Sequence, residues 1–338
     1  MIKALSTDEF LALIQQEDAV VVDVRTPLEY SKGYIPGAIN LPLFSDEERV
    51  IVGTVYKEKG QQPAILKGLE LVGPRLKGLT EQAAGLAQNN TLILHCWRGG
   101  LRSSSVAWLL NLYGLNVMTL RGGYKFFRRA VLSAPDLQRN YLILGGRTGS
   151  GKTEILNHLA RCGEQVIDLE QLARHKGSSF GSIGEKPAIS QEQFENELGL
   201  ALLKTDPGKR IWLEDESRTI GKKVLPVKLW EQMQAAHVKC IELPFEVRID
   251  YLLGIYGGYD KKELEEALLR ISRRLGGMQT KEALQALQEG DLRTTCGICL
   301  RYYDKTYDHG MSKREPHTVE RFSARVFDPS GIAGALVK

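Results

Sequence analysis

The sequence has few cysteines and no long apolar run. Its five cysteines are odd in number and show no framework spacing, which argues against a disulfide scaffold and favours reduced thiols. No stretch approaches the roughly 18 apolar residues that a membrane-spanning helix needs, so we expect no membrane partner. The first residues also lack the apolar centre and cleavage site of a secretory signal. These absences favour a cytoplasmic protein.

The composition shows no strong bias, and neither internal repeats nor low-complexity segments occur. The net charge of +4 permits a nucleic-acid partner without requiring one, because binding depends on where the charge gathers. Contents of 43% hydrophobic and 25% charged residues are typical of a globular protein. A length of 338 residues favours two domains over one.

Short apolar strands alternate with helical segments, which predicts an α/β fold. In the first half we expect strands at residues 19–24, 91–94 and 116–120, with a helix over residues 101–112. Such alternation is typical of a parallel sheet covered by helices. Residues 44–77 fit neither pattern, and we interpret them as an extended insertion.

A break at residues 133–136, Ser-Ala-Pro-Asp, divides the chain, because the proline opposes helix continuation. We therefore predict one domain over residues 1–134 and a second over residues 138–338. A new strand is expected from Tyr141. Further strands of this second sheet are predicted at residues 165–169, 210–213 and 238–243, and a mostly helical C-terminal part from residue 261.

The segment His-Cys-Trp-Arg-Gly-Gly-Leu-Arg-Ser at residues 95–103 follows a predicted strand and precedes a predicted helix. Cys96 should therefore lie at the carboxyl end of a strand, where open parallel sheets bind ligands. Loop amides and the helix N-terminus stabilise a thiolate or a bound anion, and Arg98 and Arg102 add positive charge. We predict catalytic roles for Cys96, Arg98 and Arg102, although many free cysteines are buried and inert.

Residues around this loop resemble the rhodanese domain. The matching segments are Val-Asp-Val-Arg at residues 22–25, Gly-Tyr-Ile-Pro-Gly-Ala-Ile-Asn-Leu-Pro at 33–42 and Leu-Arg-Gly-Gly-Tyr at 120–124. The resemblance implies that Cys96 carries sulfur or selenium as a persulfide-type adduct, and that Asp23 and Arg25 form a structural ion pair. Common rhodaneses place the loop arginine five residues after the cysteine, whereas Arg102 is six after Cys96. This spacing is also that of cysteine phosphatases, so the loop alone leaves both chemistries open.

A second motif predicts a phosphate-binding loop. Residues 142–153 supply a strand, a glycine-rich loop and a helix start in the order of a Walker A motif. The loop amides would face a phosphate, Lys152 would neutralise a diphosphate, and the Thr153 hydroxyl could bind Mg²⁺. No segment indicates a purine pocket. The predicted phosphate-binding residues are Gly146, Arg147, Thr148, Gly149, Ser150, Gly151, Lys152 and Thr153.

Acidic and basic clusters supply further candidates. In Glu-Asp-Glu-Ser-Arg at residues 214–218, we expect metal or substrate contacts from Asp215, Glu216 and Arg218, although a solvated strand end fits equally well. Which metal, if any, the sequence does not say. Basic residues interleaved with Tyr302, Tyr303 and Tyr307 suit single-stranded RNA, whose bases stack on aromatic rings. The predicted RNA contacts are His175, Lys176, Ser178, Arg273 and Arg274. A lone Cys-x-x-Cys pair, Cys296 and Cys299, is interpreted as structural.

The combination of the two loops resembles the bacterial tRNA 2-selenouridine synthase family over nearly the whole chain. The resemblance implies replacement of sulfur by selenium in 2-thiouridine in the anticodon region of tRNA. It further implies selenophosphate and geranyl diphosphate as co-substrates, an S-geranyl intermediate, and an enzyme that supplies selenophosphate as a partner. Two alternatives stay open: an ATP-coupled rhodanese-type sulfurtransferase or cysteine phosphatase, and a non-catalytic RNA-binding protein.

Overall fold

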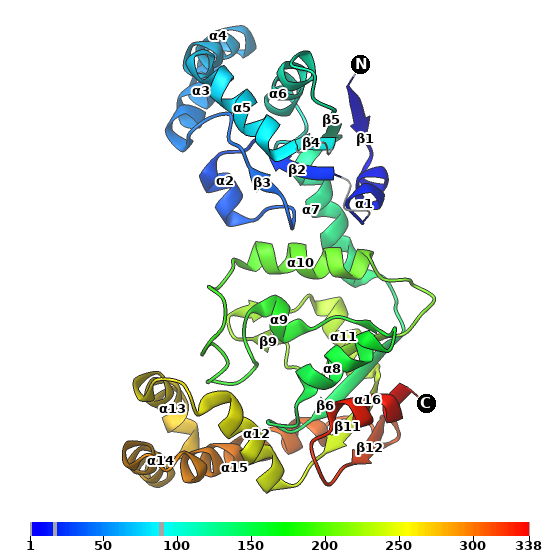
Figure 1. Ribbon diagram of the computed structural model, residues 1–338, viewed down its shortest axis with the longest axis vertical. Coiled ribbons are helices and arrows are strands. Elements are labelled where there is room, and N and C mark those ends of the chain that lie inside the picture. Colours follow the sequence, from blue (N-terminus) through cyan, green and yellow to red (C-terminus); the bar gives the residue numbers. More distant parts are fainter. Residues whose placement is uncertain (1, 16–18, 88–90, 338) are drawn as a thin grey trace. The chain divides into compact units, whose positions relative to one another are not determined.

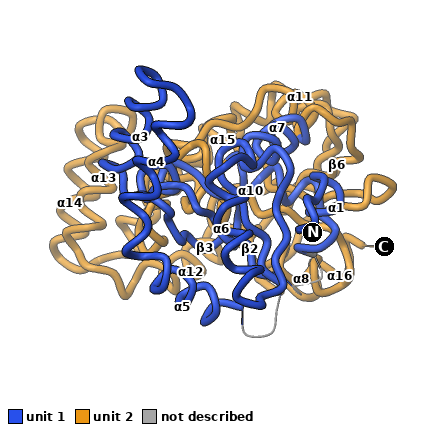
Figure 2. The backbone as a smooth tube through the Cα atoms, turned by 90° about the horizontal axis from the view of Figure 1, so that it is seen from above, with its two compact units in different colours: residues 1–134, 195–204 blue, residues 135–194, 205–338 orange. Residues whose placement is uncertain are grey.

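The computed structural model describes residues 2–15, 19–87 and 91–337 (Figure 1). The expected domain ends at residues 1 and 338 lie outside this range. The described chain forms two compact units, residues 1–134 with 195–204, and residues 135–194 with 205–338 (Figure 2). The first unit therefore includes most of a helix that the sequence assigned to the second domain.

The first unit is built on a parallel five-stranded sheet in the order β1-β5-β4-β2-β3. Its elements are β1 (Lys3–Leu5), α1 (Thr7–Gln15), β2 (Ala19–Asp23), α2 (Pro27–Lys32), β3 (Ile39–Asn40), α3 (Asp46–Lys59), α4 (Gln61–Val72), α5 (Leu76–Ala87), β4 (Thr91–His95), α6 (Leu101–Leu112), β5 (Val117–Leu120) and α7 (Gly123–Ser133). The predicted strands and helix of this half are confirmed.

The prediction of an extended insertion at residues 44–77 is wrong, because this segment is helical in α3 and α4. Ser45 and Glu48 form a reciprocal capping box at the start of α3, and Gly60 ends that helix at a φ of 84°. The capping motif satisfies backbone amides that would otherwise lack partners. The mean hydropathy of α3 is low and none of its residues is buried, so apolar periodicity could not reveal it.

The second unit contains another parallel five-stranded sheet, in the order β12-β11-β6-β8-β7. Its elements are β6 (Tyr141–Gly146), α8 (Lys152–Arg161), β7 (Gln165–Val166), α9 (Leu169–Ala173), β8 (Ile211–Glu214), β9 (Thr219–Ile220), β10 (Lys223–Val224), α11 (Val227–Ala235), β11 (His237–Glu242), α12 (Phe245–Tyr256), α13 (Lys261–Leu275), α14 (Gly277–Glu289), α15 (Leu292–Met311), β12 (Val319–Ser323) and α16 (Pro329–Val337). Helix α10 (Gln191–Leu203) is shared between the two units, and its larger part belongs to the first. Both the α/β class and the helical C-terminal part are confirmed. None of the described helices is long and apolar enough to cross a membrane.

Most of α10 packs within the first unit. Asn196 is fully buried there, and its side-chain amide donates to the Tyr124 hydroxyl at 2.7 Å and to the Tyr34 carbonyl at 3.0 Å. A Cβ at Gly199 would lie 2.3 Å from the Val131 carbonyl oxygen. The absence of a side chain at Gly199 therefore allows α10 to approach α7 closely.

A buried ion pair joins the end of β2 to the loop that follows it. Arg25 donates to both oxygens of Asp23 at 2.6–3.0 Å and to the Gly33 carbonyl at 2.8 Å. Both side chains are fully buried, and the Arg25 guanidinium lies 3.9 Å from the centre of the Tyr124 ring. The ion pair implied by the rhodanese resemblance is therefore present.

Substitution of Asp23 by Asn should strongly destabilise the first unit, because the Arg25 charge would stay buried without its counter-ion. We expect a loss of about 3–5 kcal/mol. Hydrogen–deuterium exchange of peptides covering β2 and β4 measures the stability of the first unit directly. Asp8→Asn, at an exposed position, serves as the control, and equal protection in both variants would contradict the prediction.

Candidate functional site

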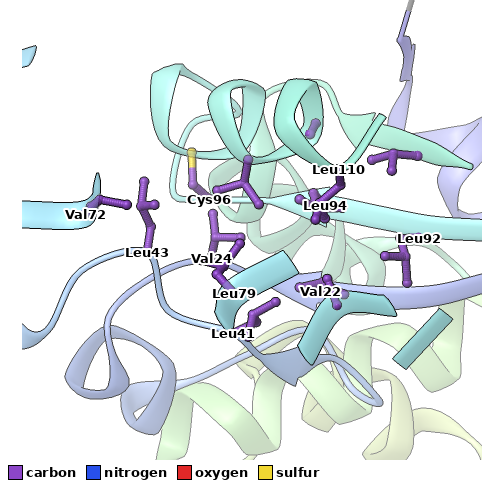
Figure 3. Close-up of a cluster of buried hydrophobic side chains, with 14 of the residues drawn as sticks. Val22, Val24, Leu41, Leu43, Val72, Leu79, Leu92, Leu94, Cys96 and Leu110 are labelled. Carbon is purple, nitrogen blue, oxygen red and sulfur yellow. The ribbon is translucent and has the colours of Figure 1, made fainter. Parts of the chain in front are cut away.

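The cysteine loop lies where the first sheet ends. Cys96 directly follows β4, and residues 97–100 lead into α6. Figure 3 shows its sulfur directed away from Val24 and toward α6. The Ser103 hydroxyl donates to the sulfur at 3.4 Å. The residue is only 3% exposed and is packed beside a buried apolar cluster, so a substrate must reach the sulfur from the loop side.

The surroundings of Cys96 favour its thiolate. Burial raises the pKa of this thiol, whereas hydrogen bonds from the Ser103 hydroxyl and amide lower it. The Arg102 charge and the Arg98 amide act in the same direction, so the pKa lies below its ordinary value. A lowered pKa is the property that separates a reactive cysteine from an inert one.

The two arginines of the loop have different roles in its geometry. Arg102 forms a bidentate ion pair with Glu29, with distances of 2.5 and 3.1 Å. The Arg98 side chain is exposed, and its backbone amide is the part that acts on the sulfur. Thus Arg102 is held in place by Glu29, while the Arg98 side chain is available to a ligand outside the loop.

The glycine pair at the start of α7, Gly122 and Gly123, packs against the backbone of the cysteine loop. Gly123 has a φ of 59°, and a Cβ there would lie 2.3 Å from the Cys96 carbonyl oxygen and 2.5 Å from the Gly99 amide. Backbone approach this close excludes any side chain. The Tyr124 and Lys125 amides donate to the carbonyls of Cys96 and Trp97, which fixes the loop.

The phosphate loop lies between β6 and α8 in the second unit. Gly151 adopts a φ of 67°, and a Cβ there would meet the Phe327 ring at 2.2 Å. The Lys152 ammonium donates to the Gly146 carbonyl at 3.2 Å. The Ser150 hydroxyl is buried and has no hydrogen-bond partner among the described residues. This loop therefore has a lysine and a hydroxyl ready for an anion.

Helix α15 braces the phosphate loop. The Gly146 amide donates to the Tyr307 hydroxyl at 2.8 Å, and Arg147 forms a bidentate ion pair with Asp308 at 2.9 Å. Arg248 of α12 is almost fully buried and joins the Thr148 carbonyl at 3.0 Å to a carboxylate of α15. Arg147, predicted to bind phosphate, is thus engaged in holding the loop in place.

Two carboxylates from different elements converge beside Lys152. Glu170 of α9 and Glu216, after β8, both lie within 3.0 Å of the place where a Cβ of Gly177 would be. Burial and the neighbouring Glu216 raise the pKa of Glu170 well above its ordinary value. Burial also raises the pKa of Glu216, against the opposing effect of the Lys152 charge. The pair therefore favours sharing a proton.

The other acidic candidates are placed differently. Asp215 accepts hydrogen bonds from Arg314 at 2.7 Å and from the Tyr307 hydroxyl at 3.1 Å. Arg218 is exposed and does not line the cavity described below. Within the described part of the chain, no group of three or more His, Cys, Asp or Glu is arranged to hold a metal ion.

A cavity of about 780 Å³ opens beside the phosphate loop. Lys152, Thr153, Glu170 and Glu216 line one part of it. Side chains of α12, α13, α14 and α15 line another part. This volume lies in the range of about 300–1,000 Å³ that is usual for small-molecule sites.

The loop over residues 175–181 borders this cavity. Lys176 and Ser178 line it, and Lys176 is paired with Glu185 at 3.2 Å. His175 is half-buried, and burial lowers the pKa of its imidazole. Arg273 and Arg274 are exposed at the end of α13 and are not part of the cavity lining. Of the predicted RNA contacts, Lys176 and Ser178 therefore line the cavity, whereas Arg273 and Arg274 do not.

Tyr303 and Tyr307 are two of the C-terminal tyrosines that the sequence relates to single-stranded RNA. Both line the cavity, and their hydroxyls bond to the Ser179 and Gly146 amides. Arg314 is buried against Asp215. Tyr303 and Tyr307 lie four residues apart, so helical spacing places both on the face of α15 that lines the cavity.

Sequence reasoning missed Glu170 and the bracing residues of α15. Asp168 and Glu170 follow the short strand β7, so their place at the carboxyl edge of a parallel sheet could have indicated them. Tyr307 and Asp308 lie more than 150 residues beyond the loop that they contact. No local pattern relates such distant positions.

Replacement of Ser103 by Ala should raise the pKa of Cys96, because the thiolate would lose its hydroxyl donor. The thiolate would then appear at higher pH than in the wild type. Ultraviolet absorbance of the thiolate during a pH titration measures this shift, with Cys96→Ser as the blank. An unchanged midpoint in Ser103→Ala would show that the hydroxyl does not act on the sulfur.

Comparison with known proteins agrees with this organisation. Residues 6–130 match the family model for the rhodanese-like domain, and residues 139–259 match that for the tRNA 2-selenouridine synthase AAA domain. A tRNA 2-selenouridine synthase of Marinobacter nauticus is 37% identical over 351 residues, covering 93% of this chain and 94% of that protein.

Other similar proteins include a tRNA 2-selenouridine synthase of Shewanella frigidimarina, 38% identical over 90% of this chain and 91% of its own. A solved rhodanese-related protein of Thermoplasma volcanium is 20% identical, with a TM-score of 0.24, over 38% of this chain and 92% of its own. The identity to full-length relatives, together with both domain matches, shows that this chain belongs to the tRNA 2-selenouridine synthase family.

Proposed function

We propose that this protein replaces the sulfur of 2-thiouridine in tRNA with selenium through an S-geranyl intermediate. Geranyl diphosphate would donate the geranyl group, and selenophosphate would donate the selenium. The substrate is the anticodon region that carries 2-thiouridine. Relatives named tRNA 2-selenouridine synthase, similar over most of their length, support the overall reaction.

The observation that carries the proposal is that one chain contains two loops suited to anions, of which one carries a cysteine nucleophile and the other carries a lysine. One surrounds a thiol of lowered pKa, and the other presents Lys152 and the Ser150 hydroxyl beside a cavity. A reaction with two anionic co-substrates, one delivering selenium and one releasing diphosphate, requires both loops. A plain sulfurtransferase would have no use for the second.

In the first step, the sulfur of 2-thiouridine forms a bond to the first carbon of the geranyl group while the carbon–oxygen bond to diphosphate breaks. The base loses its N3 proton. Lys152 and the loop amides stabilise the charge that develops on the departing diphosphate, which is the usual function of preorganised donors. Alkylation also makes the sulfur a better leaving group.

In the second step, the selenium of selenophosphate forms a bond to C2 of the base while the bond from C2 to the geranylated sulfur breaks, and geranyl thiol departs. Water then cleaves the phosphorus–selenium bond, which releases phosphate and leaves 2-selenouridine. We assign the delivery of selenium to the cysteine loop, where Cys96 is held as a thiolate and the exposed Arg98 side chain can contact the selenophosphate anion. Arg102, held by Glu29, contributes its charge to the loop.

Variants of the two loops should separate the steps. Cys96→Ser should still form S-geranyl RNA but no 2-selenouridine, because only selenium delivery needs the thiolate. Lys152→Ala should lower geranylation by about 100-fold or more, since it removes a charge from the leaving group. It should still convert RNA that is supplied already geranylated. Mass spectrometry of digested RNA measures both products.

Cys162→Ser, at an exposed cysteine beyond α8, is the matched control and should carry out both steps. Equal loss of both steps in Cys96→Ser would contradict the division of roles. ATP turnover by the purified protein without RNA would favour an ATP-coupled sulfurtransferase or phosphatase. Binding of tRNA without any modified product would favour a non-catalytic RNA-binding protein.

A further inference from the structure

Helix α15 runs along the cavity from its charged part to its apolar part. Tyr307 contacts the Gly146 amide of the phosphate loop, and Cys296 lies eleven residues earlier on the same helix. At 1.5 Å per residue, that separation is roughly 16 Å along the helix axis, and Leu292 is roughly 22 Å away. The residues of α15 at these positions all line the cavity, namely Tyr307, Tyr303, Leu300, Cys296 and Leu292.

The part of the cavity far from the phosphate loop is an apolar lobe. We define it by the lining residues Phe180, Leu264, Leu287, Leu292 and Cys299. In Figure 1, α13 and α14 lie on the side of the second unit opposite to α8, and the view of Figure 2 agrees. Leu292 lies roughly 22 Å along α15 from Tyr307, which contacts the phosphate loop, so the lobe and the phosphate loop lie at different ends of one cavity.

The walls of the apolar lobe are fixed by packing. Leu264 and Leu287 belong to one buried cluster, against which Phe180 and Tyr256 pack. The rings of Phe180 and Tyr256 are 6.0 Å apart between centroids. Preformed apolar walls of this kind are typical of small-molecule sites.

The polar groups of α15 that border the lobe are already bonded or uncharged. The Tyr303 hydroxyl accepts from the Ser179 amide at 3.1 Å, and the Thr295 hydroxyl donates to the Asp291 carbonyl at 3.0 Å. Burial raises the pKa of Cys296 to about 11 and that of Cys299 to about 12, so both thiols are neutral near pH 7. A nucleoside, with its many hydrogen-bonding groups, would find few partners here.

A ligand that fills both ends must combine a phosphate anion with an apolar tail. We propose that the apolar lobe holds the isoprenoid chain of a prenyl diphosphate whose diphosphate is bound by the phosphate loop, and that Cys296 and Leu292 of α15 limit the chain length. This inference rests on the proposed function and identifies the site of its alkyl donor. The position of each lining residue along α15 then corresponds to a distance from the bound diphosphate.

Enlarging side chains along α15 should shorten the usable lobe. The test compares transfer of dimethylallyl, geranyl and farnesyl groups, which differ in chain length, to RNA containing 2-thiouridine. In Cys296→Phe we expect kcat/KM to fall about tenfold or more for the geranyl and farnesyl donors, with dimethylallyl transfer retained. Leu292 lies farther from the phosphate loop than Cys296, so in Leu292→Trp the fall in kcat/KM should be largest for the farnesyl donor. Inhibition by inorganic diphosphate should stay unchanged in both variants.

Glu282→Phe, at an exposed position of α14 outside the cavity lining, is the matched control, because it adds the same bulk away from the lobe, and it should behave as the wild type. Thermal unfolding verifies that the variants are folded, and the two positions provide independent tests. A loss that is equal for all three donors, or no loss in either variant, would overturn the proposal.

Calorimetric binding separates this proposal from the proposed function. If the wild type transfers no prenyl group but binds geranyl diphosphate at least about tenfold more tightly than inorganic diphosphate, and Cys296→Phe removes that difference, the reaction is wrong and the chain site stands. If the two ligands bind equally to the wild type, the chain site is wrong whatever the reaction.

Discussion

The structure depends on the geometry of parallel β-strands followed by loops and helices. In such sheets the carboxyl ends of the strands meet at one edge, where backbone amides and helix N-termini favour negative charge. The chain has this arrangement twice, with the Cys96 loop after β4 and the Lys152 loop after β6. In each loop, glycines with a positive φ, which other residues rarely adopt, let the backbone turn tightly around the Cys96 sulfur or the Lys152 side chain.

Helix α15 links the chemistry of the second unit to its scaffold. Its C-terminal half holds the phosphate loop through Tyr307 and Asp308, and its N-terminal half lines the apolar lobe. This double role explains why aromatic residues that look suited to nucleic acid face inward. The cavity thus has a charged end and an apolar end, and all of its lining residues belong to the second unit.

Both loops and most strands were predictable, because glycine patterns and strand periodicity are local signals. The Cys96 and Lys152 loops lie where their motifs indicate, each between a strand and a helix. The helical insertion was not predictable from periodicity, because α3 buries no residue. The ion pair of Arg147 with Asp308 and the convergence of Glu170 with Glu216 join residues distant in sequence, and only tertiary structure brings them together.

We propose that both loops serve one modification of tRNA. The test is mass analysis of tRNA nucleosides from cells with and without this protein. We expect 2-selenouridine to disappear, and 2-thiouridine to accumulate, when the protein is absent. An unchanged amount of 2-selenouridine in cells that lack the protein would contradict it.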